Sequence, residues 1–204
     1  MTITQITAQV KNPTRCNIYL DGVFYCGLEL ETVMRNRLKV GMETEKEFLD
    51  KIQAESEVLK ALDKALTFIS RSKKTEKQVR DYLFGKGYTS VTVAEVLEKM
   101  RGYGFLDDED YAVSYANEFS SKKGKKMIAY ELKKRGVGER EIEAALSNVD
   151  GQEDAAREIA AKYMKNKERN KVNLQKCYKY LLSKGFDFDV ARAATYSGDE
   201  DTAF

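Results

Sequence analysis

The sequence has no histidine, no tryptophan, one proline and three cysteines in 204 residues. Histidine is the commonest acid or base near neutral pH and a frequent metal ligand, so its absence excludes His-dependent triads and most zinc sites. A Gly-rich phosphate loop with its lysine and Ser/Thr is missing as well. These gaps predict a protein that is not an enzyme and that uses no cofactor and no metal.

The cysteines, Cys16, Cys26 and Cys177, are an odd and sparse set, unlike the dense even sets of small secreted domains. A two-residue turn at Asp21-Gly22 would place Asn17 opposite Cys26 and turn Cys16 to the other face, which argues against a disulfide between them. The N-terminus lacks signal-peptide features, and no apolar run approaches the roughly 18 residues that span a membrane. The expected location is the cytoplasm.

The charges nearly cancel, with 35 basic and 33 acidic residues. A strongly charged field over the whole protein is therefore excluded, and any contact with nucleic acid must come from local patches. The single proline, Pro13, lies near the N-terminus, so almost nothing further along stops a helix. Long helices are expected to dominate.

The first 55 residues predict a small β-element followed by short helices. Residues 2 to 28 contain β-prone runs on both sides of the Asp21-Gly22 turn, which indicates a β-hairpin. Leu30 to Leu38 and Glu45 to Ile52 predict two short helices.

An internal repeat follows, visible when the sequence is shifted by 49 residues. The shift aligns Lys86-Gly87-Tyr88 with Arg135-Gly136-Val137 and Lys184-Gly185-Phe186. It also aligns three apolar sets: Leu83, Leu132 and Leu181; Val79, Ile128 and Cys177; and Val93, Val96, Leu97 and Met100 with Ile142, Ala145, Leu146 and Val149. Agreement at one fixed offset predicts tandem copies of one structural unit.

Each unit is predicted to hold three helices, over residues 56–106, 107–150 and 151–204. The first helices carry Leu62 and Leu66, Tyr111 and Tyr115, and Ala160 and Met164 at the shared offset. Such small units must cover one another's apolar faces, so the fold class is mainly α, an elongated array with a small N-terminal β-element. The third unit matches the repeat pattern less well, because Ala191, Ala194, Thr195 and Gly198 stand where the earlier units have larger apolar residues. It ends in the acidic Asp199-Glu200-Asp201, as suits a terminal cap.

Basic residues gather after the first helix of each unit. The candidate partner-binding residues are Arg71, Lys73 and Lys74, with Lys77 nearby; Lys122, Lys123, Lys125, Lys126, Lys133, Lys134 and Arg135; and Lys162, Lys165, Lys167, Arg169 and Lys171. Stacked units would align them into a positive stripe that suits phosphates or an acidic protein surface. The alternative is a solvated, lysine-rich helix junction that keeps the protein in solution.

Other motifs favour structural roles. Thr75-Glu76-Lys77-Gln78 fits a capping box at a helix start. Asp107 to Asp110 lack the glycine and the later glutamate of a calcium loop, so helix capping explains them better than a metal. The tyrosines at 82, 88, 103, 111, 115 and 130 fall mostly on helical core spacing, although base stacking is the alternative.

Three stretches of the repeat region form a distinctive set: Ser70 to Tyr88 (SRSKKTEKQVRDYLFGKGY), Gly104 to Ala112 (GFLDDEDYA) and Gly124 to Val137 (GKKMIAYELKKRGV). Together, and in this order and spacing, they resemble the signatures of the RecX family of regulatory proteins. The resemblance covers roughly Leu59 to Ala194. Each stretch alone is weakly diagnostic, but their combination with the repeat is specific.

The resemblance implies a curved body of three-helix repeats that lies in the groove of a RecA recombinase filament on single-stranded DNA. Binding of this kind would block filament growth and lower ATP hydrolysis and strand exchange. The positions that carry over are the Arg71-Ser72 joint, the Asp107-Asp108 helix start and the Gly124 to Val137 segment. The lysine-heavy run from Lys122 to Lys126 and the weak third repeat depart from the family pattern.

The expected protein is therefore a monomeric, non-enzymatic regulator of RecA, with weak DNA binding in addition and no membrane association. A first rival is a helical DNA-binding module that acts without RecA and binds bare DNA with a strong salt dependence. A second rival is an enzyme that uses the Asp107 to Asp110 cluster and a metal. It predicts turnover that Asp108→Ala destroys.

Overall fold

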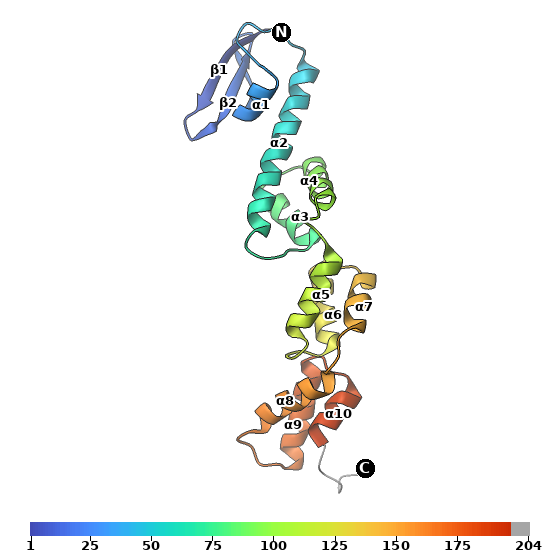
Figure 1. Ribbon diagram of the computed structural model, residues 1–204. Helices are drawn as coiled ribbons and strands as arrows, with labels where there is room; N and C mark the ends of the chain where they lie inside the picture. The colour runs from blue at the N-terminus through green and yellow to red at the C-terminus, as the bar shows by residue number, and fades with distance from the viewer. Residues whose placement is uncertain (197–204) are drawn as a thin grey trace. The chain divides into compact units, whose positions relative to one another are not determined.

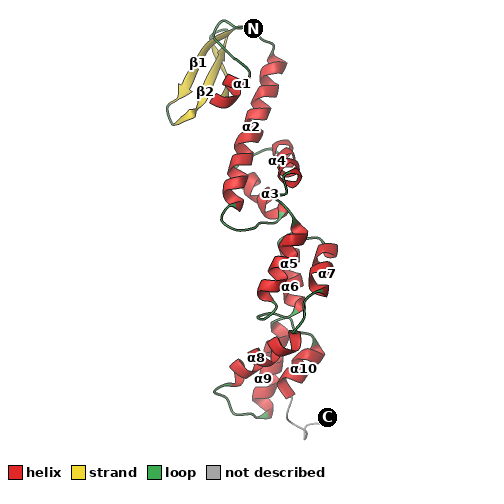
Figure 2. Ribbon diagram, viewed as in Figure 1, coloured by secondary structure: helices red, strands yellow, loops and turns green. Residues whose placement is uncertain are grey.

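The computed structural model describes residues 1–196, arranged as two compact units. The first unit is Met1–Lys73 with Val79–Phe105, and the second is Lys74–Gln78 with Leu106–Phe204. Helices dominate both units, and the strands of the described chain lie in the first (Figure 2). Gly198 and the acidic Asp199-Glu200-Asp201 fall outside the described residues.

The N-terminal element is a three-stranded antiparallel sheet in the order β1-β2-β3. Its strands are β1 (Ile3–Gln9), β2 (Asn12–Leu20) and β3 (Val23–Glu29). Leu20 pairs with Val23 around the expected Asp21-Gly22 turn, whose residues have φ of 47° and 86°. Two successive positive φ values are typical of the type I′ hairpin turn, so this prediction is confirmed.

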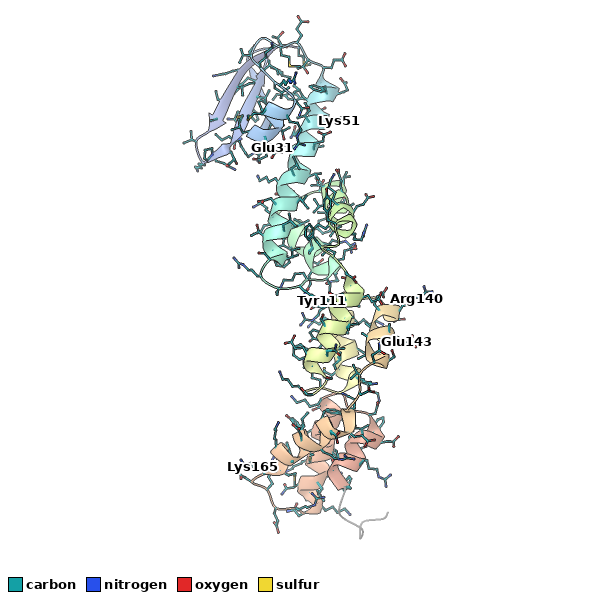
Figure 3. The ribbon with its side chains drawn as sticks, in the orientation of Figure 1. Glu31, Lys51, Tyr111, Arg140, Glu143 and Lys165 are labelled. Carbon is teal, nitrogen blue, oxygen red and sulfur yellow. The ribbon has the colours of Figure 1, made fainter. Side chains whose placement is uncertain are left out.

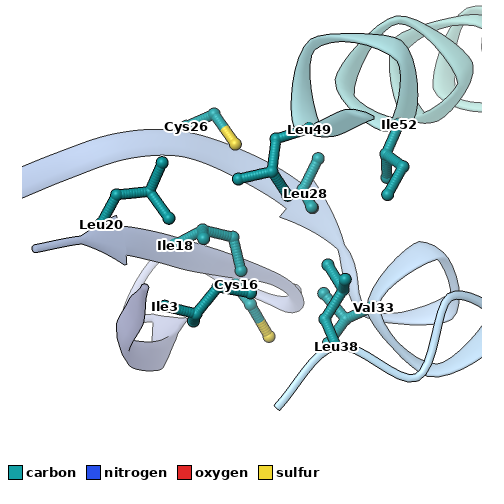
Figure 4. Close-up of a cluster of buried hydrophobic side chains, with 10 residues drawn as sticks. All are labelled: Ile3, Cys16, Ile18, Leu20, Cys26, Leu28, Val33, Leu38, Leu49 and Ile52. Atoms are coloured by element: carbon teal, nitrogen blue, oxygen red, sulfur yellow. The ribbon is translucent and has the colours of Figure 1, made fainter. Parts of the chain in front are cut away.

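The register predicted for the cysteines is wrong by one residue. An irregularity follows the Tyr19–Phe24 pair, so Ile18 rather than Asn17 lies opposite Cys26. The extra residue on β3 reverses the alternation of faces, and Cys16 and Cys26 both lie in the core beneath the sheet (Figure 4). Both remain buried free thiols, as does Cys177, and burial raises the pKa of Cys26 to about 11.

Helix α1 (Leu30–Arg35) corresponds to the first predicted short helix, but the second is only the beginning of a much longer one. Helix α2 (Lys46–Ile69) continues for 24 residues because no glycine or proline interrupts it. Its first turns place Leu49 and Ile52 in the core of the β-element. Its last turns bury Ala61 and Ala65 and form the first helix of the first repeat.

Three three-helix repeats follow the β-element (Figure 1). The first repeat combines the end of α2 with α3 and α4, the second contains α5, α6 and α7, and the third contains α8, α9 and α10. The bounds are α3 (Glu76–Gly85), α4 (Ser90–Gly102), α5 (Asp108–Phe119), α6 (Lys125–Lys134), α7 (Glu139–Ser147), α8 (Gln152–Met164), α9 (Lys171–Ser183) and α10 (Phe188–Tyr196).

The glycines predicted to close the second helices do so in every repeat. Gly87, Gly136 and Gly185 have φ of 86°, 90° and 85°. After each glycine, the next residue donates a backbone hydrogen bond to the leucine five positions earlier, as Val137 does to the Leu132 carbonyl at 3.1 Å. This pattern is the Schellman helix ending, for which a left-handed glycine is the preferred residue.

The fixed 49-residue offset holds for the second and third helices but not for the first. Val93, Val96 and Met100 of α4 are buried, as are Ile142 and Ala145 of α7 and Val149 just after it. In the first helices the fully buried residues are alanines, whereas Leu62 and Leu66 are only partly buried. These alanines are Ala61, Ala65, Ala112, Ala116 and Ala156. The first helices therefore do not share the common register of the second and third helices.

Within the second unit, the start of α6 approaches the end of α9 at backbone distance. The Gly124 N–H donates to the Lys184 carbonyl at 3.0 Å, and the Lys126 N–H donates to the Gly185 carbonyl at 3.2 Å. A Cβ atom on Gly124 would lie 2.1 Å from the Gly185 carbonyl carbon. Only glycine, which has no Cβ atom, therefore fits at this contact between the second and third repeats.

Candidate partner-binding surface

The predicted capping box at the start of α3 is confirmed and has a second role. The Thr75 N–H donates to Gln78 Oε1 at 3.1 Å, and the Gln78 N–H donates to Thr75 Oγ1 at 3.2 Å. The buried Thr75 hydroxyl also donates to the Arg135 carbonyl at 2.6 Å. This contact holds residues 74–78 to the end of α6 inside the second unit.

Two acidic residues at the start of α5 act as helix caps, Asp107 for α5 itself and Asp108 for α3. Asp107 accepts a hydrogen bond from the Asp110 N–H at 2.9 Å, and Asp108 accepts one from the Glu76 N–H at 2.9 Å. Burial raises the pKa of Asp108, and the hydrogen bond from Glu76 offsets this only in part. Within residues 1–196, no group of three or more Cys, Asp and Glu residues is arranged to hold a metal ion.

Helix α6 carries the most continuous set of the predicted basic residues. Lys126, Tyr130, Lys133 and Lys134 are exposed and recur at helical spacing, so they share one side of the helix. Ile128 and Leu132 are fully buried and fix the opposite side in the core of the repeat. We call the set formed by Lys126, Tyr130, Lys133 and Lys134 the α6 basic face.

The ion pairs on the α6 basic face are solvent-exposed. Lys126 Nζ lies 2.9 Å from Asp187, and Lys133 Nζ lies 2.7 Å from Glu139, with more than half of each side chain exposed. The hydrogen bond between the second pair raises the pKa of Lys133 and lowers that of Glu139. Exposed pairs of this kind contribute little to stability, so a partner's acidic group can replace Asp187 or Glu139.

Lys123 and Arg135 are instead turned into the middle repeat. Lys123 Nζ lies 2.6 Å and 2.8 Å from the two Glu131 oxygens and 4.4 Å from the centre of the Phe119 ring. Arg135 donates to the Tyr111 hydroxyl at 3.0 Å and lies over the Tyr115 ring. These two cations are therefore engaged inside the repeat and are separate from the α6 basic face.

The electrostatics of this internal cluster depend on Glu131. Burial raises the pKa of Glu131, but hydrogen bonds from Lys123 and Tyr115 outweigh burial and bring the pKa below 4.5. Burial lowers the pKa of Lys123, yet the hydrogen bond to Glu131 leaves it net raised. Burial and the hydrogen bond to Glu131 both raise the pKa of Tyr115. The carboxylate thus stays ionised and holds the cluster together.

The remaining predicted residues of the first two clusters occupy loops and helix starts. Lys122 is exposed with its ammonium 5.8 Å from the Phe119 ring centre, and Lys125 is partly buried with its N–H donating to Gln152 at 3.1 Å. In the first cluster, Arg71 and Lys73 are exposed and Lys74 is partly buried.

The third cluster, Lys162, Lys165, Lys167, Arg169 and Lys171, is exposed throughout. Lys165 lies on the outer side of the loop that follows α8 (Figure 3). Lys162 pairs with Glu158 at 3.4 Å, and Arg169 donates to the Thr195 carbonyl at 3.2 Å, which fixes this loop to α10.

The predicted tyrosines divide as their spacing suggests, but two others were missed. Tyr111 and Tyr115 are buried, Tyr82 and Tyr88 are partly buried, and Tyr103 and Tyr130 are 67% and 64% exposed. Tyr163 and Tyr180, which the sequence did not single out, form a stacked pair with ring centres 4.9 Å apart. The available signal was the repeat itself, because Tyr180 lies two offsets of 49 residues after Tyr82.

Comparisons with known proteins cover nearly the whole chain. The model of the regulatory protein RecX N-terminal domain matches residues 1–45. Models of the first, second and third three-helix domains of RecX match residues 61–100, 107–146 and 150–195. No helix among the described residues has the length and apolarity needed to span a membrane.

Sequence relatives and solved structures agree with the family models. A regulatory protein RecX of Clostridium perfringens (strain 13 / Type A) is 34% identical over 94% of this chain and 93% of its own length. One of Bacillus licheniformis is 33% identical over 97% of this chain and 77% of its own length. A crystal structure of regulatory protein RecX superposes with a TM-score of 0.72 at 28% identity, covering 98% of this chain and 99% of that one.

A crystal structure of RecX from Lactobacillus salivarius has a TM-score of 0.64 at 25% identity and covers 70% of this chain and 97% of that one. The three-helix repeats, the N-terminal sheet, and matches to four RecX domain models in chain order all point the same way. The chain belongs to the RecX family of regulatory proteins.

Proposed function

We propose that this protein regulates the RecA recombinase by binding its nucleoprotein filament and restraining filament growth, ATP hydrolysis and strand exchange. The α6 basic face is the proposed centre of the contact. The observation that carries this proposal is the exposure of three lysines and one tyrosine along one side of a helix whose other side is locked in the core.

The physical basis is exchange of weak ion pairs for stronger ones. Lys126 and Lys133 would give up their exposed ion pairs within the chain, which costs little free energy. In exchange they would pair with acidic groups of the partner, which lose their water when the interface forms. Tyr130 supplies an aromatic group of the type enriched at protein interfaces. Further basic residues on other repeats, such as Arg71 and Lys165, add weak contacts whose effective concentration rises once the first contact has formed.

The test is inhibition of single-stranded-DNA-dependent ATP hydrolysis by RecA. The variant Lys126→Glu/Lys133→Glu/Lys134→Glu is expected to require at least about tenfold more protein for half-inhibition, because reversed charges repel an acidic partner. Co-sedimentation with RecA filaments on single-stranded DNA measures binding directly and is expected to weaken in parallel.

A matched control is Lys39→Glu/Lys46→Glu/Lys51→Glu, which changes the net charge equally at exposed lysines of the first unit. It is expected to inhibit like the wild type, and both variants should keep the helical circular dichroism signal. Full inhibition by the α6 variant would remove the α6 basic face from the mechanism. Failure of the wild-type protein to co-sediment with filaments would refute the proposed function itself.

A further inference from the structure

The third repeat carries a stack of two tyrosines and a lysine that the proposed function does not use. The rings of Tyr163 on α8 and Tyr180 on α9 are 4.9 Å apart at 25°. Lys167 Nζ lies 3.1 Å from the centre of the Tyr163 ring, and Lys184 Nζ lies 5.3 Å from that of Tyr180. Rings this close leave no room for an ammonium between them, so Lys167 covers the outer face of Tyr163. We call these four residues the tyrosine–lysine stack.

The same arrangement recurs in the first repeat. Phe68 and Tyr82 stack with centres 4.2 Å apart at 3°, and Lys86 Nζ lies 5.3 Å from the Tyr82 ring centre. Tyr82 and Lys86 precede Tyr180 and Lys184 by the same two repeat offsets. Two repeats that share little sequence here therefore keep two aromatic rings and a lysine at matching positions.

The middle repeat shows that packing does not require this arrangement. Phe119 is retained there, but Glu131 replaces the second ring and Arg135 replaces the lysine. The helices still close around fully buried Ile128 and Leu132. Because the fold tolerates a carboxylate at this position, the rings of the third repeat are available for another role.

The surroundings of the tyrosine–lysine stack are strongly positive. Residues 160–186 contain eight basic residues and one acidic residue, Glu168. The loop between α8 and α9 is also ordered by hydrogen bonds: Arg169 donates to the Thr195 carbonyl, and the Asn173 N–H donates to the Asn170 side chain at 3.0 Å. A local positive field with partly exposed rings is the chemistry that attracts a flexible polyanion with aromatic groups.

We propose that the tyrosine–lysine stack is a platform for single-stranded nucleic acid. A nucleobase stacks on the outer face of Tyr163 in place of the Lys167 ammonium, which moves to a neighbouring phosphate. Lys165, Lys171 and Lys184 attract the backbone. A duplex, whose bases already stack on one another, offers no free base face, so the platform favours single strands. This proposal does not rest on RecA binding, and its test contains no recombinase.

The experiment is fluorescence anisotropy of fluorescein-labelled dT20, an oligonucleotide of about 20 residues that spans a few stacking sites, titrated with the full chain in low salt. Tyr163→Leu and Tyr180→Leu are each expected to weaken binding roughly tenfold, the usual loss for one stacked base. Tyr163→Phe keeps the ring and is expected to bind like the wild type. Lys167→Gln is expected to lower the slope of log affinity against log salt by about one.

Two controls separate stacking and local charge from general effects. Tyr103→Leu removes a 67% exposed tyrosine of the first unit, and Lys51→Gln removes an exposed lysine there; neither is expected to change dT20 binding. Circular dichroism checks that each variant is folded. If either leucine variant fails to fold, Lys167→Gln and Tyr163→Phe still test the platform.

Several results would overturn the proposal. They are wild-type affinity in a folded Tyr163→Leu variant, equal weakening of duplex and single-strand binding by that variant, loss of binding in Tyr163→Phe, and no saturation of the wild type up to about 100 μM, the weak end of non-specific binding. A wild-type chain that inhibits RecA but does not bind dT20 would refute the platform and leave the proposed function standing. A wild-type chain that binds dT20 but does not inhibit RecA would refute the proposed function and leave the platform standing.

Discussion

The middle and third repeats place different chemistry at one equivalent position. In the middle repeat Glu131 gathers Lys123 and the Tyr115 hydroxyl into an internal ion cluster. In the third repeat Tyr180 stacks on Tyr163, and of the neighbouring lysines Lys167 is exposed and Lys184 is partly buried. The repeats therefore share their helix ends and their buried apolar residues. The residues where the first and second helices meet at the surface vary, and they give each repeat its own surface.

The largest expected effect concerns the glycine that joins these two repeats. Gly185→Ala places a side chain at φ 85° and brings its Cβ within 2.3 Å of the Met127 nitrogen. We expect a loss of about 3 kcal/mol, since the left-handed backbone costs about 1 kcal/mol and the displaced backbone adds more. Urea unfolding followed by circular dichroism measures it.

The matched control is Gly87→Ala in the first repeat. Gly87 has the same left-handed conformation, at φ 86°, but a Cβ atom added there would meet no atom of the described residues within 4 Å. Only the conformational cost of about 1 kcal/mol is expected there. Equal losses in the two variants would show that the close approach of α6 and α9 adds nothing to stability.

A smaller effect is expected when the ion cluster of the middle repeat is broken. Glu131→Gln removes the charge that pairs with Lys123, whose side chain is only 24% exposed. We expect a loss of about 2 kcal/mol, the usual scale for a hydrogen bond to a partly buried charged group. Lys123→Met in the same chain should recover part of this loss, because it removes the unpaired ammonium; no recovery would indicate that the two residues are not coupled.

Acid unfolding sharpens the contrast between the repeats. The pKa of Glu131 is lowered in the folded chain, so its contribution is present above its ordinary value of 4.5 and is lost as the pH falls from there through the folded pKa. Melting temperatures between pH 7 and pH 3 should therefore fall less steeply for Glu131→Gln than for the wild type. Tyr180→Phe should leave the wild-type slope unchanged, and identical slopes for all three proteins would contradict the assignment.

The smallest effect is expected at the surface of α6. Lys133→Gln breaks the ion pair with Glu139, in which the two side chains are 69% and 83% exposed. Water screens such a pair, so no measurable change in melting temperature is expected at physiological salt. A clear drop would show that the pair is part of the folded structure of the repeat and not available for a partner.

The sequence was most informative where one residue type has one structural use. Gly136 and its equivalents had to be left-handed, and Thr75 with Gln78 had to cap a helix, because few other residues do either. The register irregularity between Ile18 and Tyr19 could not be predicted, since it depends on packing beneath the sheet and leaves no local signal.

The sequence identified which basic residues belong to the candidate site, but not which way their side chains point. The basic residues of the middle repeat were identified, yet Lys123 and Arg135 turn inward because Glu131, Tyr111 and Tyr115 lie beside them in three dimensions. The first helix of the first repeat was also placed too late. Its sequence carries no stop signal after Ile52, so α2 continues without a break from the β-element into the first repeat.

Helix α2 is one rod shared by two hydrophobic clusters. Leu49 and Ile52 complete the core under the sheet, and Ala61 and Ala65 complete the packing of the first repeat. Because the helix is unbroken, loss of packing at one end destabilises the other end. Unwinding of its first turns would expose the core under the sheet to water. The N-terminal residues are therefore expected to unfold together with the first repeat as one cooperative unit. A truncated chain that begins at α2 would expose the apolar side of the first turns of this helix to water and would be prone to aggregate.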